Sequence, residues 1–184
     1  MKIDYNEQML TWEWNSTEIK IEIPDIIHAE FNNDENMVIV YSGENFISKT
    51  IFYYNLGGKL LGQQNIAEGT FEWTYNGQHQ IGFHHLHHLR FNPKNQRIFS
   101  IFRTSSNFDE PSELEVYNLK GEKIYQIESP AGYTMLYISE ISKEKLRIVC
   151  EALKEDCFDK FGRSDFYFNL DLETRKWIKD GVAH

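Results

Sequence analysis

A run of histidines at residues 83–88, which reads Phe-His-His-Leu-His-His, is the feature of this sequence most suited to chemistry. Imidazole nitrogens are good ligands for zinc, copper and nickel. On a strand, side chains two residues apart point to the same face. His85 and His87 would therefore share one face and His84 and His88 the other, which leaves each pair short of a third ligand.

That third ligand would have to come from outside the run. The candidates are His79, across a predicted hairpin, and the carboxylate of Glu72, so the candidate metal set is His79, His85 and His87. The competing interpretation is that these histidines are partly buried and hydrogen-bonded to the backbone. We favour the second interpretation because the ligand set is incomplete, and we expect no metal and no other cofactor.

Other signs of catalysis are absent from the sequence. It contains no Gly-x-Ser-x-Gly and no His-Glu-x-x-His. Gly57-Gly58-Lys59 is interpreted as a β-turn rather than a phosphate site, because Lys120-Gly121-Glu122 occupies the same position in a later repeat. Cys150 and Cys157 are poorly spaced for a zinc pair. We therefore expect that the protein is not an enzyme. The alternative is a metal-dependent enzyme that uses the His84–His88 cluster.

Composition and charge restrict the class of partner. The 184 residues include 28 acidic and 19 basic side chains, for a formal net charge of −9. A direct nucleic-acid ligand is not expected, because phosphate binding needs clustered lysine and arginine. No apolar run approaches the roughly 20 residues that cross a bilayer, and no signal sequence is evident. Two cysteines suit a reducing compartment, so we expect a cytoplasmic protein without membrane contact.

The regular elements are short segments rich in β-branched and aromatic residues, bounded by turn-forming residues. Examples are residues 37–41, 51–54, 97–102, 114–117, 146–149 and 166–168. Helical periodicity is nearly absent, so the chain is predicted to be all-β. Core packing is the expected role of the four tryptophans, which lie on alternating strands: Trp12, Trp14, Trp73 and Trp177.

Three blocks of the sequence repeat one order of strands and turns. Each begins with a strand and a turn rich in Asn, Lys or Ser, and each contains a later strand that ends in Asn-Leu. The first turns lie at 32–36, 92–96 and 142–145, and the pairs are Asn55-Leu56, Asn118-Leu119 and Asn169-Leu170. The spacing from turn to pair is 23, 26 and 27 residues. Such constancy is typical of a repeated four-stranded meander.

Blocks of about 40 to 45 residues of this kind resemble the blades of WD-repeat-like β-propellers. Residues 88–93 (His-Leu-Arg-Phe-Asn-Pro) resemble an inner strand with its turn, and residues 115–122 (Glu-Val-Tyr-Asn-Leu-Lys-Gly-Glu) a third strand with its turn. The Gly-His and Trp-Asp signatures of true WD repeats are missing. The resemblance implies a partial or distorted β-propeller of about three four-stranded meander blades plus two hairpins. An open β-sandwich or curved meander is the alternative.

We expect one all-β domain over residues 1–184. It would consist of an N-terminal hairpin (1–24), a first blade (25–66), a second hairpin (67–84), a second blade (85–130) and a third blade (131–181). Asn76-Gly77 between alternating runs is a strong signal for the second hairpin.

The negative charge coincides with the long loops of these blades. Loops between second and third strands emerge on one face, and here they are residues 43–48, 104–113 and 153–164, with seven acidic and three basic residues. Turns on the opposite face have six acidic and seven basic residues. The loops are either simply solvated or meet a basic partner. The candidate contacts are Glu44, Phe108, Asp109, Glu110, Glu113, Glu155, Asp156, Phe158 and Asp159, with the two phenylalanines as apolar anchors.

These features fit a non-enzymatic, protein-binding immunity protein from a toxin–immunity pair. Such a toxin inhibitor would occlude the active site of a basic cognate toxin, for which a nuclease is the natural candidate, with its acidic loop face. The chain is similar to that class in its small size, acidity, scarcity of cysteine and lack of catalytic motifs. The alternative from another class is a propeller-like scaffold or interaction domain of a larger assembly, on which the acidic face is incidental.

Overall fold

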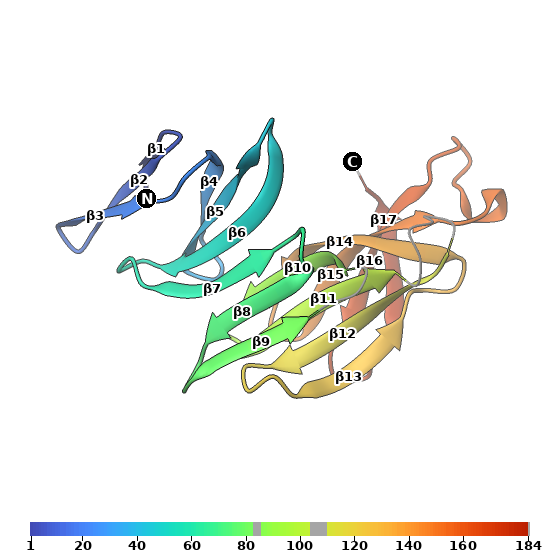
Figure 1. Cartoon of the computed structure of the whole chain (residues 1–184). Coiled ribbons are helices and arrows are strands. Elements are labelled where there is room, and N and C mark those ends of the chain that lie inside the picture. Colours follow the sequence, from blue (N-terminus) through green and yellow to red (C-terminus); the bar gives the residue numbers. More distant parts are fainter. Residues whose placement is uncertain (83–85, 104–109, 184) are drawn as a thin grey trace. The chain divides into compact units, whose positions relative to one another are not determined.

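The structure is a computed structural model that describes residues 1–82, 86–103 and 110–183. The regular elements among these residues are antiparallel strands and one short 3-10 helix, η1 (Glu155–Cys157). Contacts divide the chain into two compact units, Met1–Phe83 and His84–His184 (Figure 1). In the described part of the chain, no helix has the length and apolar character needed to span a membrane.

The first unit contains two antiparallel sheets. The smaller sheet has the order β1-β2-β3, with β1 (Ile3–Tyr5), β2 (Met9–Trp14) and β3 (Thr17–Glu22). The larger sheet has six strands in sequential order: β4 (Ile26–Asn32), β5 (Met37–Glu44), β6 (Ile47–Asn55), β7 (Leu60–Asn65), β8 (Thr70–Thr74) and β9 (Gln78–Gly82). The hairpin expected at 67–84 is therefore part of this sheet, because Glu72 of β8 pairs with Gln63 of β7.

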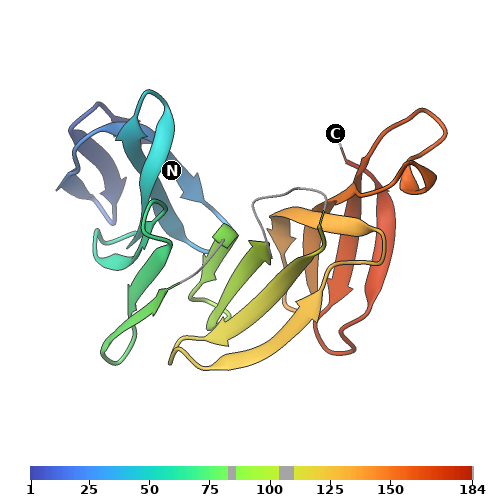
Figure 2. The same cartoon turned by 45° about the vertical axis from the view of Figure 1, so that its right-hand side comes forward.

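The second unit consists of two four-stranded meanders that lie next to each other in both views (Figures 1 and 2). The first meander is β10 (Leu86–Asn92), β11 (Arg97–Arg103), β12 (Ser112–Asn118) and β13 (Lys123–Glu128). The second is β14 (Tyr133–Ile141), β15 (Lys145–Ala152), β16 (Asp165–Asp171) and β17 (Trp177–Val182). The prediction of an all-β chain built around about three four-stranded meanders, as in a partial or distorted propeller, is confirmed, with β4–β7 as the other meander.

A recurrent turn explains the repeated Asn-Leu pair. Asn55 and Asn118 each use the side-chain oxygen to accept a backbone amide hydrogen bond of 2.9 Å from the turn that follows. Gly58 and Gly121 then adopt a φ of 83°, which favours glycine. In the last meander Asp171 takes over this role and accepts two amide hydrogen bonds. The leucine of each pair is buried: Leu56, Leu119 and Leu170.

Each unit has a hydrophobic core that joins its two sheets. In the first unit, Leu10 and Trp12 of β2 pack against Val38 and Val40 of β5. The indole Nε1 of Trp12 also donates a 2.8 Å hydrogen bond to the carbonyl of Leu56. The N-terminal hairpin is thus a three-stranded sheet docked onto the larger one, and its position depends on Trp12.

The core of the second unit includes the facing sides of both meanders. It includes Ile101 and Leu114 of the first and Ile148 and Phe168 of the second, all at most 5% exposed. Cys150 is part of this core, as expected for a small apolar residue on a strand, and burial raises the pKa of its thiol. The core fixes the two meanders to each other.

Candidate functional site

The described ends of the two long loops in the second unit are connected through the segment 129–135. The carbonyl of Ser112, at the start of β12, accepts a 2.9 Å hydrogen bond from the amide of Ser129. The amide of Leu153 donates to the carbonyl of Gly132 at 2.9 Å. The hydroxyl of Tyr133 donates to the carbonyl of Cys157 at 3.2 Å. Ser112 and the residues 153–157 are therefore both attached to this one segment.

The acidic residues predicted from the first of these loops differ in their surroundings. Phe108 and Asp109 lie outside the described residues. Glu110 is exposed. Glu113 lies within β12 rather than in a loop, and its carboxylate accepts a 2.6 Å hydrogen bond from the amide of Gln126 on β13. Only Glu110 of this group is therefore seen at the surface of a loop.

The second loop, residues 153–164, contains two exposed carboxylates that have no interaction partner among the described residues. Glu155 and Asp156 lie in η1 and are exposed. Neither carboxylate makes a hydrogen bond or an ion pair with any residue that the structure describes. Phe158 follows them at the surface with 37% exposure. This group thus places two exposed carboxylates next to a partly exposed aromatic side chain.

Asp159 organises its own loop. Its carboxylate accepts backbone amide hydrogen bonds from Phe161 (2.8 Å) and Arg163 (2.9 Å) and forms a 2.6 Å ion pair with the guanidinium of Arg163. These interactions hold the pKa of Asp159 at about 2. The charge of Asp159 is thus already compensated within the loop.

We expect the Asp159→Ala substitution to loosen this loop locally. The amides of Phe161 and Arg163 would lose their acceptor, and their hydrogen exchange would become faster by about tenfold or more. Hydrogen exchange followed by NMR measures this effect, with Asp156→Ala as the matched control, because that carboxylate holds no amide. Unchanged exchange in Asp159→Ala would show that the loop is held by other contacts.

Phe161 is an exposed aromatic that the sequence analysis missed. It is 71% exposed, about twice as much as Phe158. The Nζ of Lys160 lies 4.9 Å and the Cζ of Arg163 lies 5.3 Å from the centre of its ring. The sequence did contain a signal: Phe161 lies between Lys160 and Gly162 in a charged segment without strand alternation, so no strand would bury its side chain. The loop 153–164 contains three acidic and three basic residues, and the exposed ring of Phe161 lies next to two of the basic ones.

Glu44, the remaining predicted contact, belongs to the first unit. It ends β5 and forms a 2.8 Å ion pair with Lys49, which lowers the pKa of its carboxyl group. It thus belongs to a different compact unit from Glu155 and Asp156.

The negative charge of the protein is concentrated in the first unit. Met1–Phe83 contains 12 acidic and 4 basic residues, for a net charge of −8, whereas His84–His184 contains 16 acidic and 15 basic residues, for a net charge of −1. Five carboxylates of the first unit are exposed and make no hydrogen bond or ion pair with a described residue: Glu7, Glu13, Glu22, Asp25 and Glu68. The sequence analysis compared the charges of loops and turns and missed this asymmetry, because the boundary between the two units depends on the folded structure.

The histidines that were candidates for metal binding have other roles where they are described. His79 stacks on Trp73 with ring centroids 5.3 Å apart, and its Nε2 donates a 2.8 Å hydrogen bond to the carbonyl of Tyr75. The Nε2 of His87 lies 3.2 Å from the guanidinium of Arg103, a cation that opposes metal binding there. His84 and His85 lie outside the described residues. No cluster of three potential ligands occurs in residues 1–82, 86–103 and 110–183.

We expect the stability of the protein to depend on pH through the titration of His88. Its Nε2 is buried without a hydrogen-bond partner among the described residues, and its ring lies edge-on to Tyr137 at 6.4 Å. Burial, with the nearby charges of Arg90 and His87, lowers the pKa of His88 from 6.5 to about 3. Because the folded pKa lies below the unfolded one, protonation favours unfolding. The free energy of unfolding is therefore highest above pH 6.5, where His88 is neutral in both states, and it decreases as the pH falls from 6.5 towards 3.

We expect the free energy of unfolding to be about 1–2 kcal/mol smaller at pH 5 than at pH 7.5 because of His88. Urea unfolding at the two pH values measures it. His88→Phe, which keeps a ring of similar volume, should remove most of this difference. His28→Phe is the matched control, because His28 is exposed. An equal pH dependence in wild type and His88→Phe would contradict the assignment.

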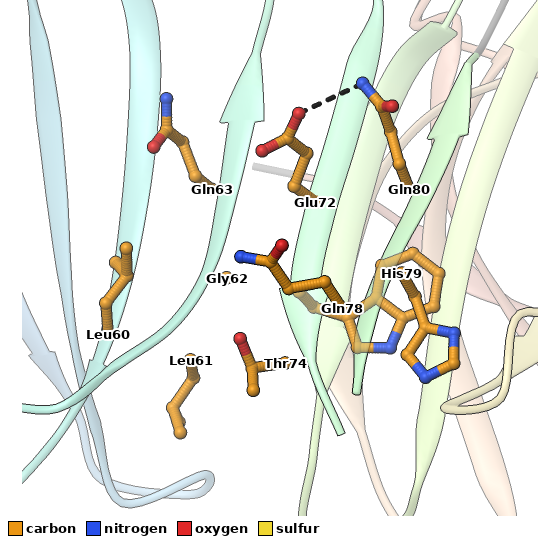
Figure 3. Close-up of a pocket in the computed structure, with 10 residues that line it drawn as sticks. Leu60, Leu61, Gly62, Gln63, Glu72, Thr74, Gln78, His79 and Gln80 are labelled. Atoms are coloured by element: carbon orange, nitrogen blue, oxygen red, sulfur yellow. Dashed lines mark hydrogen bonds between the residues drawn. The ribbon is translucent and has the colours of Figure 1, made fainter. Parts of the chain in front are cut away.

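A shallow groove of about 320 Å³ lies on the larger sheet of the first unit, over β7, β8 and β9 (Figure 3). Gln63, Glu72 and Gln80 form a polar row across these strands, and the amide of Gln80 donates a 3.0 Å hydrogen bond to Glu72. The lining also includes Thr74 and His79, and the His79 ring stacks on Trp73.

The sequence matches no protein family, and no curated protein is similar to it. Among solved structures, the chain is similar to the N-terminal domain of Nup159, with 10% sequence identity and a TM-score of 0.43; the match covers 98% of this chain and 57% of that chain. It is also similar to a protein of unknown function from Bacteroides caccae, with 14% identity and a TM-score of 0.44, over 96% of this chain and 55% of that chain. A third similar structure is Hsv2 of Kluyvelomyces marxianus, with 12% identity and a TM-score of 0.48, over 96% of this chain and 78% of that chain. The chain spans little more than half the length of the first two. Function is therefore argued from the residues of this chain.

Proposed function

We propose that this protein is a non-enzymatic binding module for a basic protein. The observation that carries the proposal is the concentration of negative charge in the first unit, which contains 12 acidic and only 4 basic residues. Three of those four basic residues already form ion pairs at the surface: Lys2, Lys20 and Lys49. A field of one sign steers a partner of opposite charge and raises its association rate.

We further propose that the biological role is that of an immunity protein, which neutralises a basic cognate toxin by covering its active site. A nuclease is the natural candidate, because an enzyme that holds nucleic acid must itself be basic. Carboxylates on the immunity protein would then occupy the positions that phosphates take in the substrate. The exposed Glu155, Asp156 and Phe158 of the second unit are a further contact group in this proposal.

The test is capture of the partner from the native host, first at low ionic strength and then at about 0.5 M salt, where exposed charges are screened. One basic protein, held at low salt and weakened at high salt, is the expected result. That protein should be toxic when it is expressed alone and harmless when it is expressed with this chain. Several salt-resistant partners would contradict the proposal and favour a scaffold.

A further inference from the structure

A cleft of about 630 Å³ opens in the first unit, where three connections between strands meet. Its walls come from the residues around the β1–β2 connection, the β3–β4 connection and the β5–β6 turn. The lining that matters here combines aromatic, apolar and acidic side chains: Tyr5, Glu7, Asp25, Ile26, Ile27 and Phe46. The cleft is thus suited to a ligand that is cationic at one end and apolar along its length.

Backbone hydrogen bonds hold the walls of this cleft in place. The amide of Ile26 donates to the carbonyl of Glu7 at 3.1 Å, which fixes the β1–β2 connection to β4. The amide of Gly43 donates to the carbonyl of Asp25 at 2.9 Å, which fixes the β3–β4 connection to β5. The acceptor carbonyl of each bond belongs to one of the two acidic residues, so the backbone of Glu7 and of Asp25 is held in place. A preorganised cleft loses little entropy when it binds.

Phe46 stands at the tip of the β5–β6 turn and is 91% exposed. Its φ of 61° lies in the left-handed region, which is unusual for a bulky side chain. The turn depends on Gly43, because a Cβ atom at that position would lie 2.0 Å from the carbonyl oxygen of Ile47. Phe46 gains almost no burial in return for this conformation. Its ring is therefore accessible to a ligand in the cleft that it lines.

The charges at the cleft are not balanced. Glu7 and Asp25 are exposed, and their carboxylates make no hydrogen bond or ion pair with any residue in the described ranges. Glu44, which also lines the cleft, is compensated by Lys49 at 2.8 Å. The lining contains no lysine or arginine. A cationic group of a partner would therefore find two carboxylates available and no competing cation in the wall.

We propose that this cleft is a socket for an arginine side chain of a protein partner. A planar guanidinium stacks on aromatic rings such as Tyr5 and Phe46 and donates paired hydrogen bonds to carboxylates such as Glu7 and Asp25. The aliphatic part of the side chain would lie against Ile26 and Ile27. Lysine, a compact and strongly hydrated cation, satisfies this combination less well. The inference rests on the proposed function only for the basic nature of the partner.

The test uses a blocked peptide, acetyl-Gly-Arg-Gly-amide, added to the full chain and followed by the backbone amide signals in NMR. We expect saturable shifts at residues 5–7, 25–27 and 43–46, and at least about fivefold weaker binding of the corresponding lysine peptide. Asp25→Asn should weaken arginine binding by about fivefold or more. Asparagine tolerates the φ of 55° at this position, so the turn is retained. Phe46→Leu should also weaken arginine binding, because it removes the ring on which the guanidinium would stack while it keeps an apolar side chain at the turn.

Glu68→Gln is the matched control, since it removes one exposed carboxylate from the same unit outside the cleft. It should leave the affinity for the arginine peptide unchanged. Equal weakening by Glu68→Gln and Asp25→Asn, or shifts scattered over both units, would overturn the socket and indicate nonspecific attraction. The proposed function is tested separately by partner capture. Arginine binding at the cleft without a basic partner would leave the socket standing and refute the function, and the reverse result would refute only the socket.

Discussion

Association with the basic partner is expected to become about tenfold slower or more when Glu13, Glu22 and Glu68 are all replaced by lysine. These residues are exposed in the first unit, and the variant changes the net charge of that unit from −8 to −2. Electrostatic steering depends on such a field and contributes about 10- to 1,000-fold to association rates. Stopped-flow mixing with the captured partner at low ionic strength measures the effect. The difference should vanish at about 0.5 M salt.

The matched control places the same charge change in the second unit. A variant with Glu110, Glu155 and Asp156 replaced by lysine has the same total charge as the first variant, since each replacement adds two charges to −9 and both arrive at −3. We expect this control to slow association less than the first variant does. Equal slowing would show that total charge alone matters. Greater slowing by the control would instead support the loop face predicted from the sequence.

Trp12→Ala is expected to reduce the free energy of unfolding by about 3–5 kcal/mol, a large part of the stability of a small protein. Trp12 is 3% exposed, packs between the two sheets of the first unit and donates a hydrogen bond to the carbonyl of Leu56. The substitution leaves a cavity and an unsatisfied carbonyl at the contact between the sheets. Equilibrium urea unfolding, followed by circular dichroism, measures the loss.

Trp14 provides the control for this prediction. It lies two residues further along β2 but is 39% exposed, so Trp14→Ala should cost about 1 kcal/mol or less. Trp12→Phe should fall between the two, because it restores most of the apolar volume but not the hydrogen bond. Similar losses in Trp12→Ala and Trp14→Ala would mean that the N-terminal sheet is not held by the core described above.

The strands and turns of this protein were predictable because they depend on residues close together in the chain. Alternating β-branched and aromatic residues specify strands wherever they occur. The Asn of the Asn-Leu pair bonds to amides of the turn that it begins, as Asn55 and Asn118 show, so its spacing reports the meander directly. The fold class and the number of meanders follow from such local rules.

The candidate site was less predictable, because exposure depends on the arrangement of segments distant in sequence. The sequence identified the loop 153–164 as charged, yet Asp159 is neutralised by Arg163 and Phe161 is the more exposed aromatic. Glu113 was counted with a loop, but pairing of β12 with β13 places it beside Gln126. A side chain on a short loop has no periodic pattern from which its partner can be inferred.

Residue types and their spacing were enough to predict the all-β class, the repeated meanders, the asparagine turns and the acidic total charge. Three features became visible only in the folded chain: β8 and β9 continue the sheet of β7, Trp12 is buried while Trp14 is not, and the first unit carries almost all of the net charge. The difference arises from the range of the interactions involved. Turns and strand propensities act over a few residues, whereas sheet order, burial and the electrostatic field arise from residues that only folding brings together.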